Sequence, residues 1–514
     1  MTGTIYSLIP PLIMIILVLL TRKVTLSLGV GIIIGALFIH EFNVMDSIQQ
    51  IWSAFYGIFV AEGGPNMGTF YLLFFLIFLG MLTAFMSASG GTRAFGEWAI
   101  TKIQTKKGAQ LLPFFLGIII FIDDYFNSLA IGQVARPLTD RHKISRAKLA
   151  YLIDSTSAPV AVLSPISSWG AFIIGTIGAI IAEHNLSNFQ PLESFVRMIP
   201  MNIYAIIAIF LVFLVVIFKL NLGAMRKHEQ RAEETGELVD PNRNDIPGEL
   251  KEEFVQTNSG RIYHLTIPIV VLIISTIAAM VITGRNNVEE NATLLTIFEN
   301  TNVNLSLFIG GLIAVYHSAI FYLIQMQPKT STFLVLREGI KSMLPAIYIL
   351  ILAWVIGTII ENLGTGDYLA LVVERSQLSP SYLPVIVFIV CGIMAFATGT
   401  SWGTFGIMLP IVGQIAVNSD VNMLLASLAA VLAGSVFGDH CSPISDTSIL
   451  SSTGAGSNHI DHVLTQIPYA VIAAIITIIG YVVLGITGMV WITLILSLVL
   501  LFATALILNK LTQS

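Results

Sequence analysis

Apolar runs long enough, or nearly long enough, to cross a lipid bilayer recur along the whole sequence. A transmembrane helix needs about 20 consecutive residues that are mostly apolar. Hydrophobic residues make up 55% of the chain and charged residues 11%, whereas soluble domains carry about 25% charged residues. The sequence therefore predicts an all-α polytopic membrane protein, and it offers no basic domain for binding nucleic acid. The apolar runs lie at 5–20, 25–40, 68–86, 109–135, 147–183, 195–219, 263–283, 306–326, 343–360, 382–417, 422–450, 468–487 and 489–509.

Basic residues between these runs predict the orientation of the chain, because cytoplasmic loops are enriched in Lys and Arg. If the loop that contains Arg22 and Lys23 is cytoplasmic, nearly all of the 25 Lys and Arg residues fall on the same side. Only Arg285 and Arg375 lie clearly outside, and Arg197 lies at an edge. We therefore expect a multi-pass protein of the bacterial plasma membrane, with its N-terminus outside and its C-terminus in the cytoplasm.

This orientation holds only if two of the runs return to the side from which they start. The run 109–135 contains FIDDYFNS, which cannot lie in lipid as a continuous apolar helix. We predict a re-entrant hairpin that enters from the cytoplasm, with its tip at 123–128. The run 382–417 contains FATGTSWGTFG, and we predict a second hairpin that enters from outside, with its tip at 398–404.

Each predicted hairpin is followed by an apolar run that contains the tetrapeptide SPIS. The first copy occupies 164–167 and the second occupies 442–445. Proline removes a backbone donor and interrupts a helix, so both runs are predicted to be broken helices. A hairpin and a broken helix thus occur twice with opposite orientation. This order predicts an inverted-topology repeat, which is the architecture of many secondary transporters.

The expected organisation of the chain follows from these features. A polar segment of mixed charge joins the two halves, and it is too poor in apolar residues to form a packed domain. We expect a solvated linker there, with a regulatory element as the alternative. The expected units are N-terminal scaffold helices at 1–67, a first repeat at 68–221 (hairpin 109–135, broken helix 147–183), a cytoplasmic linker at 222–262, scaffold helices at 263–342, a second repeat at 343–487 (hairpin 382–417, broken helix 422–450) and a C-terminal helix at 488–514.

Broken helices at membrane depth point to a ligand site. Non-helical backbone is tolerated there only inside protein or beside a water-filled cavity. Freed carbonyl oxygens, together with Ser, Thr and Asn side chains, suit a small hard cation such as Na⁺. Helix N-termini suit a carboxylate instead, so the architecture by itself leaves both ligands open.

Aspartates lie at the first predicted tip and beside the broken helices. A charge at the bilayer centre costs about 2.5–3.5 kcal/mol on insertion scales, so these acids are functional candidates. Asp154 could instead cap a helix, and either Asp123 or Asp124 could face the site. His440 could carry a proton or serve as a structural hydrogen-bonding group. His459 and His462 are expected in a loop near the cytoplasmic surface. The aspartates are Asp123, Asp124, Asp154, Asp439 and Asp446.

These motifs resemble those of a known family. The stretch GDHCSPISDTSILSSTGAGSNHIDHV at 438–463 resembles the signature of NhaC-type Na⁺/H⁺ antiporters. FIDDYFNSLAIG followed by DSTSAPVAVLSPISSWG resembles the first-half counterpart in that family. The resemblance covers roughly 68–183 and 343–487. It places the chain in an ion-transporter group that includes divalent-anion/sodium symporters, and it implies a homodimer in which one domain moves like an elevator.

The resemblance also implies which residues bind the transported ion or substrate. Na⁺ is expected at a subset of them that includes Asp439 or Asp446. No cofactor and no catalytic residue is expected, and the partners are the lipid bilayer and a second copy of the chain. The implied residues are Asp123, Asp124, Asn127, Ser128, Asp154, Ser155, Thr156, Ser164, Ser167, Thr398, Thr400, Ser401, Thr404, Asp439, His440, Ser442, Ser445, Asp446 and Thr447.

The favoured function is a secondary antiporter, not an enzyme, that exchanges cytoplasmic Na⁺ for external H⁺. A carboxylate that binds Na⁺ when ionised and releases it when protonated makes the two ions compete for one site. The alternative is a Na⁺- or H⁺-coupled carrier or exchanger of a small carboxylate or amino acid, for example one that exchanges malate and lactate. Trp169 and Trp402 would fit such a solute, although packing is the expected role of both. A passive channel is disfavoured by the predicted repeat.

Overall fold

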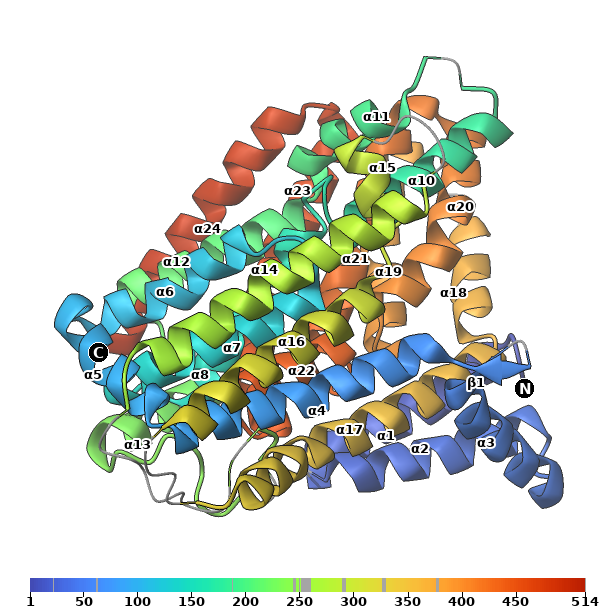
Figure 1. The fold of residues 1–514 in the computed structure, drawn as a ribbon. Helices are drawn as coiled ribbons and strands as arrows, with labels where there is room; N and C mark the ends of the chain where they lie inside the picture. Colours follow the sequence, from blue (N-terminus) through green and yellow to red (C-terminus); the bar gives the residue numbers. More distant parts are fainter. Residues whose placement is uncertain are drawn as a thin grey trace.

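The computed structural model is almost entirely helical. It describes residues 1–21, 23–61, 63–186, 188–243, 246–248, 250, 260–288, 293–325, 330–375 and 379–513. Within these residues the strands are β1 (Val60–Ala61) and β2 (Gly64–Pro65), which form a short antiparallel pair. Most long helices run lengthwise through the molecule, and the two chain ends lie at opposite ends of it (Figure 1).

Eight helices in the described residues are long and apolar enough to cross a membrane. A bent pair, α11 (Pro191–Met198) and α12 (Ile203–Phe218), would add a ninth span with a bend of 49°. The protein is therefore a multi-pass helical membrane protein, as the sequence predicts. The spans involve α4 (Met67–Ala88), α14 (Tyr263–Asn286), α16 (Val303–Ile324), α17 (Thr332–Asn362), α19 (Leu383–Thr398), α21 (Leu424–Cys441), α23 (His459–Thr487) and α24 (Val490–Gln513).

Shorter helices connect or flank these spans. Several of them carry too many polar residues to appear as apolar runs, and the sequence did not predict α3, α5, α13, α15 or α18. The remaining helices are η1 (Ile5–Leu8), α1 (Ile9–Thr21), α2 (Val24–Ile39), α3 (Val44–Phe59), α5 (Gly91–Lys102), α6 (Lys106–Ile119), α7 (Asp124–Arg141), α8 (Arg146–Asp154), α9 (Ala158–Ala161), α10 (Ser168–Glu183), η2 (Ile199–Met201), α13 (Ala224–Glu234), α15 (Leu294–Glu299), α18 (Thr365–Glu374), η3 (Pro380–Tyr382), α20 (Ser401–Ser419), η4 (Val421–Met423) and α22 (Asp446–Ala455).

Both predicted hairpin regions consist of two helices joined by a short break. α6 and α7 pack together, and only residues 120–123 separate them. The predicted tip at 123–128 lies too far along the chain, because the Asp123 side chain accepts the backbone N–H of Phe126 (2.9 Å) and caps α7 there. In the second region α19 ends at Thr398 and is followed by Gly399, which has φ +72°, and α20 begins after Thr400 within the predicted tip. Glycine adopts this left-handed conformation without steric cost.

The SPIS copies interrupt helices as predicted. The first lies between α9 and α10, and the Ser167 hydroxyl accepts the backbone N–H of Gly170 (2.9 Å) to start α10. The second separates α21 from α22, and the Ser445 hydroxyl accepts the N–H of Ser448 (3.1 Å). Each proline lies in the break between two helices, and the serine that closes the motif caps the second helix, since serine is a favoured N-cap residue.

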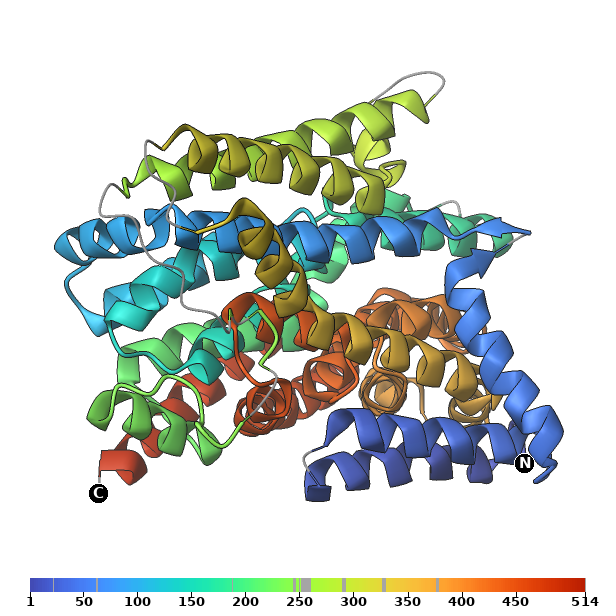
Figure 2. The same cartoon turned by 60° about the horizontal axis from the view of Figure 1, so that its bottom comes forward.

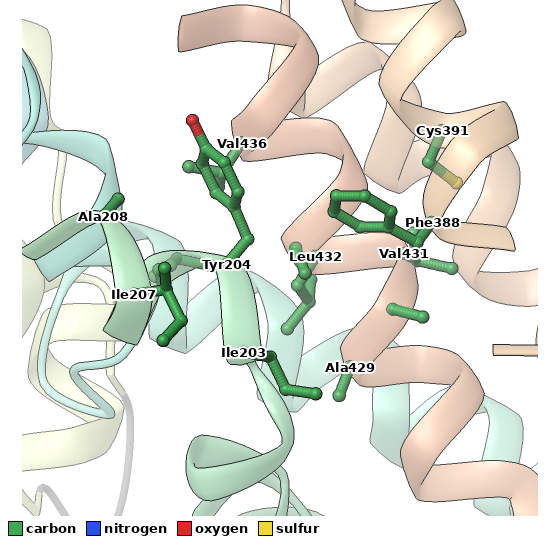
Figure 3. Packing of buried hydrophobic residues seen from close by; sticks show 14 of the residues in the cluster. Ile203, Tyr204, Ile207, Ala208, Phe388, Cys391, Ala429, Val431, Leu432 and Val436 are labelled. Carbon is green, nitrogen blue, oxygen red and sulfur yellow. The ribbon is translucent and has the colours of Figure 1, made fainter. Parts of the chain in front are cut away.

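Buried side chains fill the spaces between the helices. In Figure 3, Ile203 and Tyr204 of α12 lie in one hydrophobic cluster with Phe388 of α19 and Leu432 of α21. All four side chains are buried. Close packing of this kind fixes the relative positions of helices that are far apart in the sequence.

The linker is more ordered than the sequence suggests. Its helix α13 packs on α8 and α23, and Glu229 is only 3% exposed. That carboxylate accepts the backbone N–H of Ser145 (2.8 Å) and pairs with Lys106 (2.9 Å). Burial opposes the charge of Lys106, but Glu229 and Glu233 outweigh it and raise the pKa of the ammonium. The first part of the predicted solvated linker is thus a docked helix, whereas 244–245, 249 and 251–259 lie outside the described residues.

One of the tight contacts between the two halves of the chain joins two glycines. A methyl group added to Gly132 of α7 would lie 2.2 Å from the carbonyl oxygen of Gly454 in α22. We expect Gly132→Ala to lower the free energy of unfolding by about 1–3 kcal/mol, because the backbone would have to move. The measurement is the thermal melting of the purified full-length protein.

The matched control for this prediction is Gly29→Ala in α2. A methyl group there would meet nothing within 4 Å in the described structure. We expect that variant to melt at or slightly above the wild-type temperature, because alanine favours helix by up to about 1 kcal/mol over glycine. Equal melting of Gly132→Ala and Gly29→Ala would contradict the tight crossing of α7 and α22.

Candidate functional site

The N-terminal ends of α7, α10 and α22 meet at one place and hold carboxylates there. Asp124, the first residue of α7, accepts hydrogen bonds from the Trp169 indole N–H (2.9 Å) and the Thr447 hydroxyl (3.0 Å). Asp123 accepts one from the Ser168 hydroxyl (3.0 Å). Helix N-termini carry partial positive charge and favour acidic groups. The helix breaks therefore position these acids.

The second half of the chain adds Asp446, the first residue of α22, to this group. The Tyr125 hydroxyl donates a hydrogen bond to its Oδ2, and the backbone N–H of Thr447 donates to its Oδ1 (2.8 Å). Asp124 also interacts electrostatically with Asp123 and with Asp446. Three carboxylates from two distant stretches of sequence thus form one acidic cluster.

The acidic cluster lines a cavity of about 660 Å³. The described residues of its lining include no Lys, Arg or His, so its charge is negative whenever the aspartates are ionised. The cavity reaches the connections between α14, α15 and α16, which contribute amide and hydroxyl groups. Its lining is Asp123, Asp124, Tyr125, Ser168, Asn287, Asn300, Thr301, Asn302, Val303, Asn304, Thr400, Trp402 and Asp446.

A second cavity of about 800 Å³ adjoins the first and is more apolar. The two share Ser168, Thr301, Val303 and Trp402 as lining residues. The Trp402 ring lies 5.2 Å from the ring of Phe172 on α10. Together the two cavities offer an acidic end and an aromatic, apolar end.

Trp169 has a role that the sequence did not reveal. It packs against Trp402, with ring centroids 5.5 Å apart, as the packing interpretation predicts. It is also fully buried and donates its indole N–H to Asp124. Tyr125 and Ser168 were missed as well, although both adjoin predicted site residues. The signal available in the sequence was their position beside the acids and beside the first SPIS.

Asp154 lies in a separate, fully buried network and does not line the cavity. Its Oδ1 accepts from the Ser451 hydroxyl (3.1 Å), and its Oδ2 accepts from the Ser448 hydroxyl (2.8 Å) and the Gln466 side-chain amide (2.6 Å). His462 Nε2 lies 3.0 Å from the same Oδ2. Asp154 is the last residue of α8, and its carboxylate binds these side chains of α22 and α23 in place of the helix-capping role considered as the alternative.

The expectation that His459 and His462 lie in a surface loop is also wrong. α23 begins at His459, nine residues before the apolar run, and Asn458 caps it by accepting the N–H of Asp461 (3.2 Å). Both histidines are buried. His462 and Gln466 are four residues apart on α23 and therefore share a face. The sequence would have predicted a buried polar partner for these two residues if the helix predicted at 468–487 had been started at His459.

Asp439 and His440 lie at the end of α21 and do not line the acidic cavity, although Asp439 interacts electrostatically with Asp446. Asp439 accepts a hydrogen bond from the Ser401 hydroxyl (2.9 Å), and its Oδ1 has no hydrogen-bond partner among the described residues. The His440 ring lies between the hydroxyls of Ser155 (3.0 Å) and Tyr204 (2.8 Å). Both ring nitrogens thus have hydroxyl partners, which fits the structural alternative for this histidine.

Most of the other implied residues stabilise the helix breaks. The Asn127 side-chain amide donates to the carbonyl oxygens of Gly117 (2.8 Å) and Ile120 (2.7 Å) and so closes the α6–α7 turn. Ser128 is hydrogen-bonded to Ser451 (3.0 Å) across the two halves. The Ser164 hydroxyl accepts the backbone N–H of Ile166 within the first SPIS break (3.3 Å). The remaining members donate to backbone carbonyls or cap helices: Thr156, Ser167, Thr398, Thr404, Ser442 and Ser445. Only Asp123, Asp124, Thr400 and Asp446 of the implied set line the acidic cavity.

A multi-pass helical protein with an acidic cavity at the ends of broken helices has the features of a membrane transporter. Residues 160–486 match the model of the Na⁺/H⁺ antiporter family, and the chain belongs to that family. This match confirms the family resemblance seen in the sequence.

The relatives of this chain include proteins of known and unknown function. An uncharacterized protein of Haemophilus influenzae is 43% identical over 492 residues, which are 95% of this chain and 92% of that protein. The malate-2H⁺/Na⁺-lactate antiporter of Bacillus subtilis is 28% identical over 193 residues, 37% of this chain and 39% of its own. The Na⁺/H⁺ antiporter NhaC of Alkalihalophilus pseudofirmus is 28% identical over 148 residues, which are 29% of this chain and 32% of that protein. The last two therefore align over only 37% and 29% of this chain.

The enclosed Asp154 and the cavity-lining Asp446 predict different effects on stability. Asp154→Ala would leave its hydroxyl, amide and imidazole partners without an acceptor in the buried interior. We expect it to lower the free energy of unfolding by about 3–5 kcal/mol, because removing one member of a buried polar network leaves the others unsatisfied. Thermal melting in detergent measures the loss.

Asp446→Ala is the matched control. It removes an acid that lines the cavity and is repelled by the neighbouring carboxylates of the acidic cluster. We expect its melting temperature to stay near that of the wild type, since lost hydrogen bonds and relieved repulsion offset one another. If Asp154→Ala melted no lower than Asp446→Ala, Asp154 would not hold the interior together.

Proposed function

We propose that the protein is a secondary active antiporter that exchanges cytoplasmic Na⁺ for external H⁺ by alternating access. The observation that carries this proposal is the acidic cluster of Asp123, Asp124 and Asp446. It lines a cavity whose described residues include no basic side chain. A cavity of this charge favours a cation over a carboxylate. Membership of the Na⁺/H⁺ antiporter family supports the same conclusion.

The arrangement of the carboxylates gives a physical basis for exchange. Three carboxylates at close range repel one another when all are ionised, and this repulsion favours a bound proton or a bound cation. Na⁺ entering the cavity would bind ionised carboxylates and displace a proton, and a returning proton would release Na⁺. The hydroxyls of Thr447 and Tyr125 hold Asp124 and Asp446 in place while these charges change.

The proposal includes the architecture that alternating access needs. The pairs α6–α7 and α19–α20 act as re-entrant hairpins of two inverted repeats, and Asp123, Asp124, Asp439 and Asp446 lie at or beside the breaks. The short turns at 120–123 and 399–400 and the two SPIS breaks support this arrangement. The transporter would function as a homodimer in the plasma membrane, with the N-terminus outside. In that orientation the acidic cavity faces the exterior.

A second candidate function is the coupled transport of a small organic solute. The two adjoining cavities of about 660 and 800 Å³ are far larger than one Na⁺ requires, and Trp402 lines both. The name of the Bacillus subtilis relative gives malate and lactate as its substrates. The lining of this chain supplies no cation for a carboxylate among its described residues, so an amino acid that carries an ammonium group fits better than a dicarboxylate.

Proteoliposomes with an imposed pH gradient test the proposal. We expect external Na⁺ alone to drive proton movement, measured with a pH-sensitive dye. Asp124→Asn and Asp446→Asn should each reduce the rate at least about tenfold, since loss of one charged ligand costs more than about 1.4 kcal/mol of binding free energy. Asp420→Asn, at the far end of α20 from the cavity, is the control and should transport like the wild type.

Two results would contradict this proposal in different ways. Proton movement that needs malate, lactate or an amino acid would refute Na⁺/H⁺ exchange and support the second candidate. Wild-type rates in Asp446→Asn would remove that residue from the site, even if Na⁺/H⁺ exchange itself were observed.

A further inference from the structure

Helix α3 divides its surface into three distinct faces. Successive residues of a helix are 100° apart, so Ser47, Ala54 and Ile58 fall on one side, and all three are buried. The residues on a second side are polar or small and exposed: Asp46, Gln49, Ser53 and Gly57. The third side is apolar and exposed, and we call it the aromatic stripe: Met45, Ile48, Trp52, Phe55 and Tyr56.

Every side chain of the aromatic stripe is exposed. Met45 is 73% exposed and Trp52 is 63% exposed. The Trp52 ring lies 5.9 Å from that of Phe55 and 6.4 Å from that of Tyr56, so the rings form one continuous patch. In water such a patch would be unfavourable, and it therefore indicates a surface that is normally covered.

The position of α3 distinguishes it from the membrane-spanning helices. It follows α2 at the end of the molecule where the N-terminus lies, and it runs steeply across the lengthwise helices there (Figure 2). Its buried face packs on α2 and α17, and the Ser47 hydroxyl donates to the carbonyl oxygen of Ala36 in α2 (3.2 Å). α3 is thus held across the end of the bundle and does not extend the bundle axis.

We propose that α3 lies in the membrane–water interface, with the aromatic stripe inserted at the boundary between lipid headgroups and acyl chains. A helix with an apolar face beside a polar face, oriented across the spans, is the form that lies in the plane of a bilayer. Trp and Tyr are enriched at this depth because their rings are apolar and their N–H and O–H groups are polar.

Lipid fits the stripe better than a second copy of the chain. α2, on which α3 packs, is a shorter apolar helix that exposes Leu26 and Ile33, so the two helices together expose apolar side chains that lipid can cover. The described helix carries Asp46 and no Lys or Arg, so no anionic headgroup is required. The partner is therefore a zwitterionic lipid surface such as phosphatidylcholine, at the end of the protein that the sequence predicts to be external.

Spin labels in phosphatidylcholine vesicles test this placement. The native cysteines, Cys391 and Cys441, are buried and can be replaced by alanine. Single cysteines are then introduced in the full chain as Ile48→Cys and Trp52→Cys in the stripe, and Gln49→Cys and Ser53→Cys on the polar face. We expect stripe labels to collide several-fold more with oxygen than with a water-soluble nickel chelate, and polar-face labels to show the reverse.

Each alternative outcome overturns the proposal. Stripe labels that meet the nickel chelate as often as those at Ser53 would place the stripe in water. If stripe labels collide with neither reagent, and if the labels of two protein copies broaden each other's spectra, a second copy of the chain covers the stripe. Brominated phosphatidylcholine gives an independent measurement without cysteines: it should quench the wild type more than Trp52→Phe, and equal quenching would exclude contact between Trp52 and lipid.

Discussion

The packing of this protein's interior depends on the hydrogen bonds that one buried carboxylate accepts. Asp154 accepts hydrogen bonds from α22 and from α23 while belonging to α8, and it thereby joins elements some 300 residues apart in the sequence. A charged or polar group in an apolar bundle is tolerated only when such partners surround it. The short helices around the second SPIS are consequently fixed to the first half of the chain, and the acidic cavity is built on that junction.

The aspartates illustrate how partners decide the role of one residue type. Asp154 is enclosed by donors, whereas Asp123, Asp124 and Asp446 combine a few donors with an open cavity and with one another. The enclosed acid supports the fold, and the open acids are free to exchange ligands. Functional sites often retain charged groups that reduce the stability of the protein, because binding needs charge that the protein itself does not neutralise.

Much of this could be predicted from the sequence, and the failures have physical causes. The apolar runs, the SPIS breaks and the antiporter motifs depend on local composition and are read directly. The burial of His462 was missed because the helix that carries it begins in a polar stretch, where its partner Asp154 is the decisive neighbour. The shift of the first predicted tip arose because Asp123 caps α7, so helix replaces the expected loop. The docked part of the linker depends on Glu229 and Lys106, whose pairing is a tertiary contact.

The contact between Gly132 and Gly454 has a mechanical consequence. α7 and α22 approach until backbone meets backbone, and the pair Ser128–Ser451 joins them at the same crossing. Asp124 and Asp446 are the first residues of these two helices. The distance between their charges is therefore fixed by a backbone contact between glycines, which have no side chain that could adjust. A conformational cycle that pried the two helices apart would have to break this contact. A motion that keeps α7 and α22 in contact moves the acidic cluster as a rigid unit. Access of ions to the cluster then changes through movement of the surrounding helices.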